Sequence, residues 1–296
     1  MNQVTIQVPA TSANLGPGFD TFGCAWNLYA KITLTLLPEN VLEITGCDAA
    51  FCGKDNLVYQ AYCHTLEKMG VSAQQGLHIH IDSQIPVCRG LGSSAALLAA
   101  GALGANALFG SPFSIAQILA VTNELEGHPD NLAPALYGGL AASLTEMGVP
   151  ITRKFPVAMG WKFLTLVPDF TLSTTLARSV LPQQVSRADS IFNTAHGVMV
   201  LRALADGDAE LLKIAMQDKI HQNYRKSLIP DYDTIQQMVE EAGGVFAMSG
   251  AGPTLLAISK SDALQKALEE KLPQNTQAHW RILPLQIDDE GAKICL

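Results

Sequence analysis

The sequence is poor in charge, and most of the charge that it has is negative. Only 16% of its 296 residues are charged, and 19 Lys and Arg stand against 27 Asp and Glu, which gives a net charge of −8. The chain contains no run of basic residues. We therefore expect no nucleic-acid partner and no anionic membrane surface, since both attract basic stretches. An anionic ligand must be held locally, by backbone N–H groups or by a few Lys and Arg side chains.

The sequence also lacks the segments that direct a chain to or across a membrane. Its N-terminus, MNQVTIQVPATSANLG, has no basic region followed by an apolar core, so we expect no signal peptide. The most apolar run, residues 95–109, is shorter than the roughly 20 residues that a membrane-spanning helix needs. The six cysteines form neither a CxxC pair nor a zinc spacing, which favours reduced, mostly buried thiols. These features predict a globular cytoplasmic protein, for which a homodimer is the default oligomeric state.

What the chain does have is apolar material, at 48% of its residues, in a mixture of strand and helix periods. We expect strands at residues 4–8, 31–37, 41–44, 77–82, 141–144, 161–167, 245–247, 254–259 and 280–287. We expect helices at 56–69, 93–109, 114–125, 185–205, 209–220, 232–242 and 262–270, and from 131 and 174. The lack of strict alternation predicts α+β layers rather than a doubly wound sheet. Pro, Gly and a basic pair within residues 145–156 favour a boundary there, with domains at 1–152 and 153–296.

The stretch PVCRGLGSSAA, residues 86–96, places glycines and hydroxyls directly before an uncharged helix. It is not a Walker A loop, because no Lys follows the glycines. It fits GxGxxA, but the acid that a dinucleotide site needs about 20 residues later is absent, which argues against that fingerprint. Ser93 or Ser94 can cap the helix. A Gly-rich turn before a helix N-terminus also suits phosphate, and a serine hydroxyl there can ligate Mg²⁺.

Four segments, taken in order along the chain, resemble motifs of the GHMP kinases. They are VPATSANLGPGFDTFGCAWNLY from residue 8, the loop at 86–96, EGHPDNLAPALYGG from residue 126, and MSGAGPTLLAI from residue 248. The resemblance implies an N-terminal domain like ribosomal protein S5 domain 2, a ferredoxin-like C-terminal domain, and a site between them. It implies transfer of a phosphoryl group from ATP, with Mg²⁺, to an alcohol. The first motif is most similar to the branch that converts L-homoserine to O-phospho-L-homoserine for threonine synthesis.

The resemblance also implies which residues hold the nucleotide and the metal. The phosphate loop would comprise Pro86, Val87, Cys88, Arg89, Gly90, Leu91, Gly92, Ser93, Ser94, Ala95 and Ala96. Ser94, or its neighbour Ser93, and Glu126 would ligate Mg²⁺, with Asp130 as the alternative acid. Asn56 would contact the adenine, although its position alone indicates a helix cap.

A small amino acid with a hydroxyl needs an Arg for its carboxylate and oxygen acceptors for its ammonium group. The resemblance places Asn14, Asp20, Asn131, Thr174, Arg178 and Arg225 around the substrate, and it makes Asn131, Arg178 and Glu126 catalytic. The resemblance aligns Asn131 with a position at which the mevalonate kinase branch has an Asp that serves as a base. Asn131 would therefore orient the substrate hydroxyl without accepting its proton. Two alternatives stay open. The protein could be another GHMP kinase, such as a mevalonate kinase, or a ligand sensor on this fold that binds ATP and substrate without phosphoryl transfer.

Overall fold

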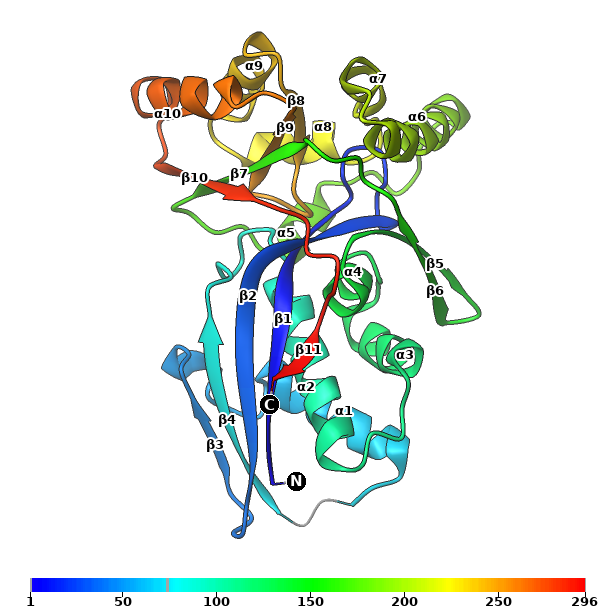
Figure 1. Ribbon diagram of the computed structural model, residues 1–296, viewed down its shortest axis with the longest axis vertical. Helices are drawn as coiled ribbons and strands as arrows, with labels where there is room; N and C mark the ends of the chain where they lie inside the picture. The colour runs from blue at the N-terminus through cyan, green and yellow to red at the C-terminus, as the bar shows by residue number, and fades with distance from the viewer. Residues whose placement is uncertain (1, 73–74, 296) are drawn as a thin grey trace.

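Two β-sheets lie one above the other along the long axis of the computed structural model, which describes residues 2–72 and 75–295 (Figure 1). Within these residues the lower sheet has seven strands in the order β11-β1-β2-β4-β3, with β5 paired to β2 and β6 to β5. Its strands are β1 (Gln3–Ala13), β2 (Phe22–Leu37), β3 (Leu42–Thr45), β4 (Gly76–Ser83), β5 (Leu140–Glu146), β6 (Val149–Phe155) and β11 (Lys293–Cys295). The upper sheet, in the order β10-β7-β9-β8, contains β7 (Lys162–Pro168), β8 (Val245–Met248), β9 (Leu255–Ser259) and β10 (Trp280–Leu285).

Helices pack in the lower half of the molecule, and one of them begins within the predicted phosphate loop (Figure 1). They are α1 (Leu57–Met69), α2 (Ser93–Leu108), α3 (Ile115–Glu126) and α4 (Leu132–Tyr137), with the short 3₁₀ turn η1 (Ala49–Phe51) before α1. Small residues let α2 pack closely: a Cβ on Gly101 would lie 2.2 Å from the backbone oxygen of Val58 in α1. Helix α2 is therefore buried along most of its length, which fixes the position of its N-terminus.

The upper sheet has the antiparallel strand order of a ferredoxin-like fold, because its spatial order β10-β7-β9-β8 places the fourth, first, third and second of its strands, counted along the chain, side by side. Leu164 and Leu166 face one core with α9 (Tyr232–Glu241) and α10 (Ala263–Asn275), whereas Phe163 and Val167 face the other core. That second core includes residues of α6 (Arg187–Asp206) and α7 (Ala209–Ala215). The period of two along β7 thus separates two apolar layers. The predicted two-domain α+β fold is confirmed.

Several elements differ from the sequence-based expectation. Strand β1 continues through Pro9 to Ala13, with a register shift between Pro9 and Ala10, because its second half pairs with the start of β2. Residues 145–156, expected to be a boundary, form most of the β5–β6 hairpin, in which Met147 and Gly148 make the turn at positive φ. The expected boundary at 152/153 thus falls inside β6, and β11 brings the end of the chain back to β1.

The helix expected at 209–220 ends at Ala215, as α7. The Asp218 carboxylate accepts hydrogen bonds from the backbone N–H groups of Ile220, His221 and Gln222, and so starts a new element. Side chains that bind nearby backbone groups compete with helix continuation in this way. The new element is α8 (Gln222–Arg225), followed by the 3₁₀ turn η2 (Lys226–Leu228).

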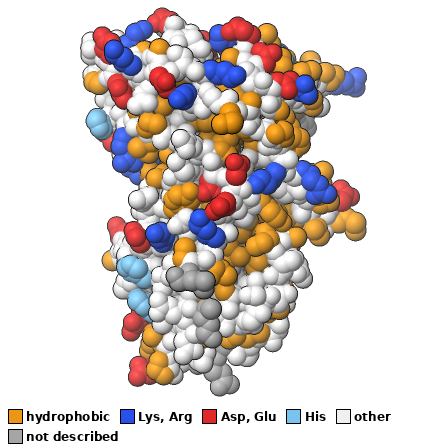
Figure 2. All heavy atoms as spheres, viewed as in Figure 1, with side chains coloured by type: hydrophobic (Ala, Val, Ile, Leu, Met, Phe, Trp, Pro, Cys, Tyr) orange, Lys and Arg blue, Asp and Glu red, His pale blue; other side chains and the backbone are white. Residues whose placement is uncertain are grey.

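On the face drawn in Figure 2, Lys and Arg side chains are interspersed with Asp and Glu rather than gathered into one patch. Within residues 2–72 and 75–295, no helix is long and apolar enough to cross a membrane. All six cysteines are free thiols, but only Cys24 is buried, so the expectation that most of them would be buried is wrong.

Candidate active site

A cavity of about 580 Å³ lies where the two halves of the molecule meet. Its walls come from the β1–β2 turn, the segment from β3 to α1, the loop before α2, the α3–α4 loop, α5 (Thr174–Ser179), α8 and the β8–β9 loop. The predicted site residues that line it are Asn14, Asp20, Asn56, Val87, Cys88, Arg89, Gly90, Gly92, Ser93, Ser94, Glu126, Asn131, Thr174, Arg178 and Arg225. Pro86, Leu91, Ala95 and Ala96 are not part of the lining, and the last three are buried in the core.

The phosphate loop ends in a helix start that no side chain caps. The N-cap is Gly92, at φ +69°, and not a serine as the sequence suggested. Ser93 and Ser94 are the first two helical residues, so their hydroxyls are not used as the N-cap. The first N–H groups of a helix have no partner within it, and the helix dipole makes this end favourable for anions. A Gly-rich loop with these free donors can hold phosphate.

The upper sheet braces this loop from behind. Ser249 Oγ donates to the carbonyl oxygen of Gly90 at 2.6 Å, and the N–H of Thr254 donates to the carbonyl of Arg89. The guanidinium of Arg89 lines the cavity, but it donates to the carbonyls of Val87, Pro168 and Asp169. The segment MSGAGPTLLAI therefore acts on the loop through backbone and hydroxyl contacts, and Arg89 acts first as a link to the upper sheet.

We expect Gly92→Ala to lower the free energy of unfolding by more than the about 1 kcal/mol that alanine costs at a left-handed position. A Cβ on Gly92 would lie 1.9 Å from Thr11 Oγ1, which must then move. Urea denaturation measures the change. Gly70→Ala is the matched control, since Gly70 has φ +68° and no heavy atom of the described residues lies within 4 Å of its Cβ position. Equal losses in the two variants would contradict the close packing of the loop.

Ser94 and Glu126 face each other across the cavity wall. The Ser94 hydroxyl donates to Glu126 Oε2 at 2.8 Å. Burial raises the pKa of Glu126, although the hydrogen bond from Ser94 acts in the opposite direction. The two groups offer a hydroxyl and a carboxylate oxygen at one place, and these are donors that Mg²⁺ prefers.

Asp130, the alternative acid, is already engaged by its own loop. Its Oδ1 accepts from the N–H of Asn131 at 3.0 Å and lies 2.8 Å from His128 Nδ1. Asp20, His128 and Asp130 do offer three potential ligand atoms within 4.8 Å of one another. Asp20, however, is bound to Arg178, so this cluster is already balanced by a cation.

Asn131 is oriented by a residue that the sequence did not single out. Thr11 Oγ1 donates to Asn131 Oδ1 at 2.7 Å, which occupies the amide oxygen. The amide NH₂ is then the group that Asn131 can offer to a ligand, as a donor. Thr11 lies within the first of the four motifs, VPATSANLGPGFDTFGCAWNLY, but its role depends on the approach of β1 to the α3–α4 loop, which sequence alone does not show.

Charged groups gather at the end of the cavity near the β1–β2 turn. Arg178 binds Asp20 with two hydrogen bonds, at 2.7 and 3.1 Å, and this contact raises the pKa of Arg178. Asn14, at φ +70°, accepts from the N–H of Asp20 and donates to the carbonyl of Gly250. The turn thus presents a carboxylate and an amide oxygen together.

Arg225 is a buried cation without a carboxylate of its own. It is 1% exposed, and it donates to the carbonyl oxygens of Ala177 and Gly250. No carboxylate of the part of the chain that the structure describes lies within ion-pair distance of it. Burial, followed by the nearby charge of Arg178, lowers the pKa of Arg225 to about 10, so it stays charged at neutral pH. A buried unpaired charge is costly, and an anionic ligand would relieve that cost.

The other end of the cavity is apolar. Asn56 lines it, but both ends of its amide are used: Oδ1 accepts from the N–H of Val58, and Nδ2 donates to the carbonyl of Phe51. It is therefore a helix cap, and a contact with adenine stays a prediction. The apolar residues that line this end are Phe51, Leu57, Ile81, Ile85 and Leu97. The sequence did not predict this lining, because its residues come from separate segments of the chain.

Family comparison assigns both halves of the chain. Residues 56–139 match the GHMP kinases N terminal domain, and residues 200–278 match GHMP kinases C terminal. The chain is 40% identical over 295 residues to a homoserine kinase of Clostridium beijerinckii, covering 98% of each chain. It is 44% identical over 304 residues to a homoserine kinase of Synechococcus sp., covering 99% of this chain and 98% of that one.

Solved structures give the same picture of the fold. A homoserine kinase from Cytophaga hutchinsonii superposes with a TM-score of 0.86 at 27% identity, covering 100% of this chain and 98% of the other. A mevalonate kinase of L. major in complex with R-mevalonate gives a TM-score of 0.73 at 17% identity, covering 96% of each chain. The second likeness extends to the fold alone.

Proposed function

Since the chain belongs to the homoserine kinases of the GHMP kinase family, we propose that it transfers the γ-phosphoryl group of ATP to the side-chain hydroxyl of L-homoserine. The products are ADP and O-phospho-L-homoserine, a step of amino-acid biosynthesis. The observation that carries the choice of an amino acid is Arg225, a buried guanidinium at the cavity that lacks a carboxylate partner. We further propose a cytoplasmic location, and the oligomeric state stays a prediction.

The charged end of the cavity fits the two ionic groups of the substrate. Arg225, with Arg178 beside it, would receive the α-carboxylate, because a guanidinium binds a carboxylate with two parallel hydrogen bonds. Asp20 and the amide oxygen of Asn14 would receive the ammonium group. Thr174 lines the same cavity one helical turn before Arg178. Arg178 would then exchange part of its contact with Asp20 for contacts with the substrate.

The opposite side of the cavity fits a nucleotide and Mg²⁺. The N–H groups at the start of α2 and the loop before it would hold the phosphates, with the base toward the apolar end. Ser94 and Glu126 fit a divalent cation by donor chemistry and by their mutual distance. Ser94 and Glu126 would hold the Mg²⁺ ion, which would supply neutralisation of the charge that develops in phosphoryl transfer. The protein's own residues supply positioning, which is most of what phosphoryl transfer requires.

Asn131 would orient the acceptor hydroxyl and not deprotonate it. Its NH₂ group would donate to the hydroxyl oxygen, since Thr11 already occupies its amide oxygen. Glu126 would serve the metal with Ser94, and Asp130 holds the His128 ring and the N–H of Asn131, so we assign the role of base to neither carboxylate. The hydroxyl proton would pass to a phosphate oxygen or to water during transfer.

We expect Asn131→Asp to be slower than wild type, with kcat lowered by about 10-fold or more. The new carboxylate would accept from Thr11 as the amide does, but it would place a negative charge toward the phosphoryl group. Steady-state ADP release at saturating substrates measures the effect. A faster Asn131→Asp enzyme would show that a base at this position assists, and would overturn the orienting role.

The function itself is tested by ADP release from Mg-ATP with L-homoserine, L-serine, L-threonine and R-mevalonate in separate reactions. A Ser94→Ala/Glu126→Gln double variant is the control for contaminating kinases. Turnover on L-homoserine that the control abolishes would support the proposal. Turnover on R-mevalonate alone would overturn the substrate, and ATP binding without turnover on any acceptor would favour a sensor.

A further inference from the structure

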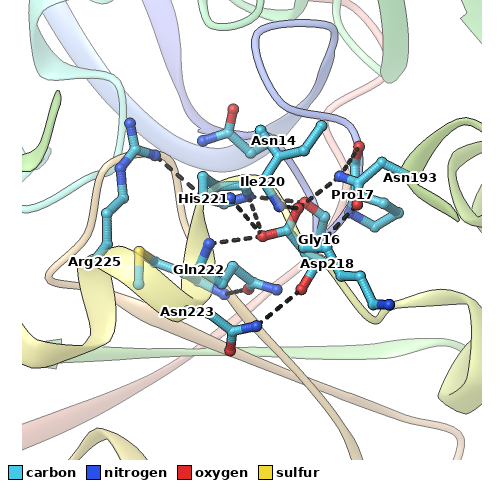
Figure 3. A network of polar contacts seen from close by, with 12 residues as sticks. Asn14, Gly16, Pro17, Asn193, Asp218, Ile220, His221, Gln222, Asn223 and Arg225 are labelled. Atoms are coloured by element: carbon cyan, nitrogen blue, oxygen red, sulfur yellow. Dashed lines mark hydrogen bonds and ion pairs between the residues drawn. The ribbon is translucent and has the colours of Figure 1, made fainter. Parts of the chain in front are cut away.

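His221 lies at the centre of a buried polar network beside the cavity (Figure 3). Its side chain is fully buried and does not line the cavity. One ring nitrogen, Nε2, lies 2.8 Å from the carbonyl oxygen of Gly16, and the other, Nδ1, lies 3.3 Å from Arg225 Nη1. The ring thus connects the β1–β2 turn, which carries Asn14 and Asp20, to α8, which carries Arg225.

The two partners leave only one protonation state for the ring. A carbonyl oxygen can only accept, so Nε2 must carry a hydrogen. A guanidinium can only donate, so Nδ1 must be free of one. His221 is therefore neutral, with its proton on Nε2. Burial lowers the pKa of His221 and outweighs the opposing charge of Asp218, which agrees with this geometry.

A second layer of contacts fixes the ring and the turn. The Asp218 carboxylate accepts from the N–H of His221 and from Asn193 Nδ2, and the same amide donates to the carbonyl of Pro17. Figure 3 shows these groups gathered around His221. The network ties the turn at residues 16–18 to α6 and to the start of α8.

Phe19 adds a stacking contact between the same parts. Its ring lies 5.3 Å from that of His221, in a stacked arrangement. The guanidinium carbons of Arg225 and Arg178 lie 5.2 and 5.6 Å from the centre of the Phe19 ring. Both arginines of the charged end are thus packed on a ring that His221 supports.

We infer that His221 is a positioning residue for recognition of the acceptor's carboxylate, an inference that rests on the proposed function. Its Nδ1 accepts from Arg225 and fixes the direction of the guanidinium, while its Nε2–H holds the turn that presents Asn14 and Asp20. The His221 ring therefore positions both Arg225, which would bind the carboxylate, and the turn that would bind the ammonium group. His221 acts on acceptor affinity and not on the nucleotide.

Two substitutions separate the two hydrogen bonds. In His221→Asn, the amide oxygen lies near the position of Nδ1 and accepts from Arg225, but the bond to Gly16 is lost. In His221→Gln, the amide NH₂ lies near the position of Nε2 and donates to Gly16, but Arg225 loses its acceptor. We expect His221→Gln to raise KM for L-homoserine by about 10-fold or more, the effect of a hydrogen bond to a charged group. His221→Asn should raise it less, and both should leave KM for ATP and kcat close to wild type.

The controls separate this inference from the proposed function. His80→Gln, on an exposed strand position, should match wild type, and thermal melts of all variants verify folding. If wild type neither binds nor phosphorylates L-homoserine, the proposed function fails. If wild type does and the Asn and Gln variants are equally impaired, or KM for ATP changes with them, the positioning role is overturned. Nitrogen NMR of the wild-type ring is independent of turnover: a proton on Nδ1 at neutral pH would also overturn it.

Discussion

Arg225→Met is expected to lower kcat/KM for L-homoserine by about 10²- to 10³-fold, while KM for ATP stays within about twofold of wild type. Arg225 is charged, buried and surrounded by neutral hydrogen-bond partners, so under the proposed function the substrate carboxylate would supply its missing counter-charge. Removing one partner of a buried charge pair costs about 2–5 kcal/mol, which corresponds to the expected range. Methionine keeps most of the volume of the side chain and removes the charge.

A substrate analogue that lacks the carboxylate tests the proposed pair of Arg225 and the substrate carboxylate more strictly. Wild type should discriminate strongly against the amino alcohol that lacks only the carboxylate, and Arg225→Met should lose most of that discrimination. Arg202→Met is the control, because Arg202 is exposed on α6 and pairs with Asp206. An Arg225→Met enzyme that still prefers L-homoserine by the wild-type factor would place the carboxylate elsewhere.

The sequence predicted those parts of the fold in which local pattern and burial agree. The alternating segment at β7 and the helical spacing of α3 lie where they were expected. It could not predict β11, because three residues carry too little pattern and the strand exists only through pairing with β1. It interpreted residues 145–156 as a boundary, because a two-residue turn at Met147 and Gly148 does not differ in composition from a linker.

The sequence predicted site residues that lie within recognisable motifs. It did not predict the roles of residues that depend on contacts made only in the folded chain. Arg178 and Arg225 are 47 positions apart, and the structure brings both to one cavity. The roles of Thr11 and His221 could not be predicted in this way, because the bonds of Thr11 to Asn131 and of His221 to Gly16 join residues far apart in the sequence. The capping role assigned to the loop serines was wrong because Gly92 reaches a left-handed φ that serine avoids, and so ends the loop one residue earlier.

Glu126→Gln is expected to lower kcat by about 10²- to 10³-fold, because charge neutralisation at a metal site contributes several kcal/mol. The amide is nearly isosteric and can still accept from Ser94, so the fold is preserved. Its effect on stability should be opposite to its effect on activity. Burial raises the pKa of Glu126 above its unfolded value, so the ionised form weakens the folded state at neutral pH. Without divalent cations the variant should therefore melt at the same temperature as wild type or higher.

Glu124, two residues earlier on α3, is the matched control for this prediction. It is exposed and bound to Lys68 and His64, and the Lys68 hydrogen bond, ahead of that from His64, lowers its pKa. A lowered carboxyl pKa contributes stability above the unfolded pKa and loses it as the pH falls. Glu124→Gln should thus keep full activity and melt slightly lower at pH 7, with the difference shrinking in acid. Added Mg²⁺ should raise the melting temperature of wild type and Glu124→Gln, but not that of Glu126→Gln. If Glu126→Gln keeps wild-type activity, or if Mg²⁺ stabilises it as it does wild type, Glu126 is not a ligand of the metal.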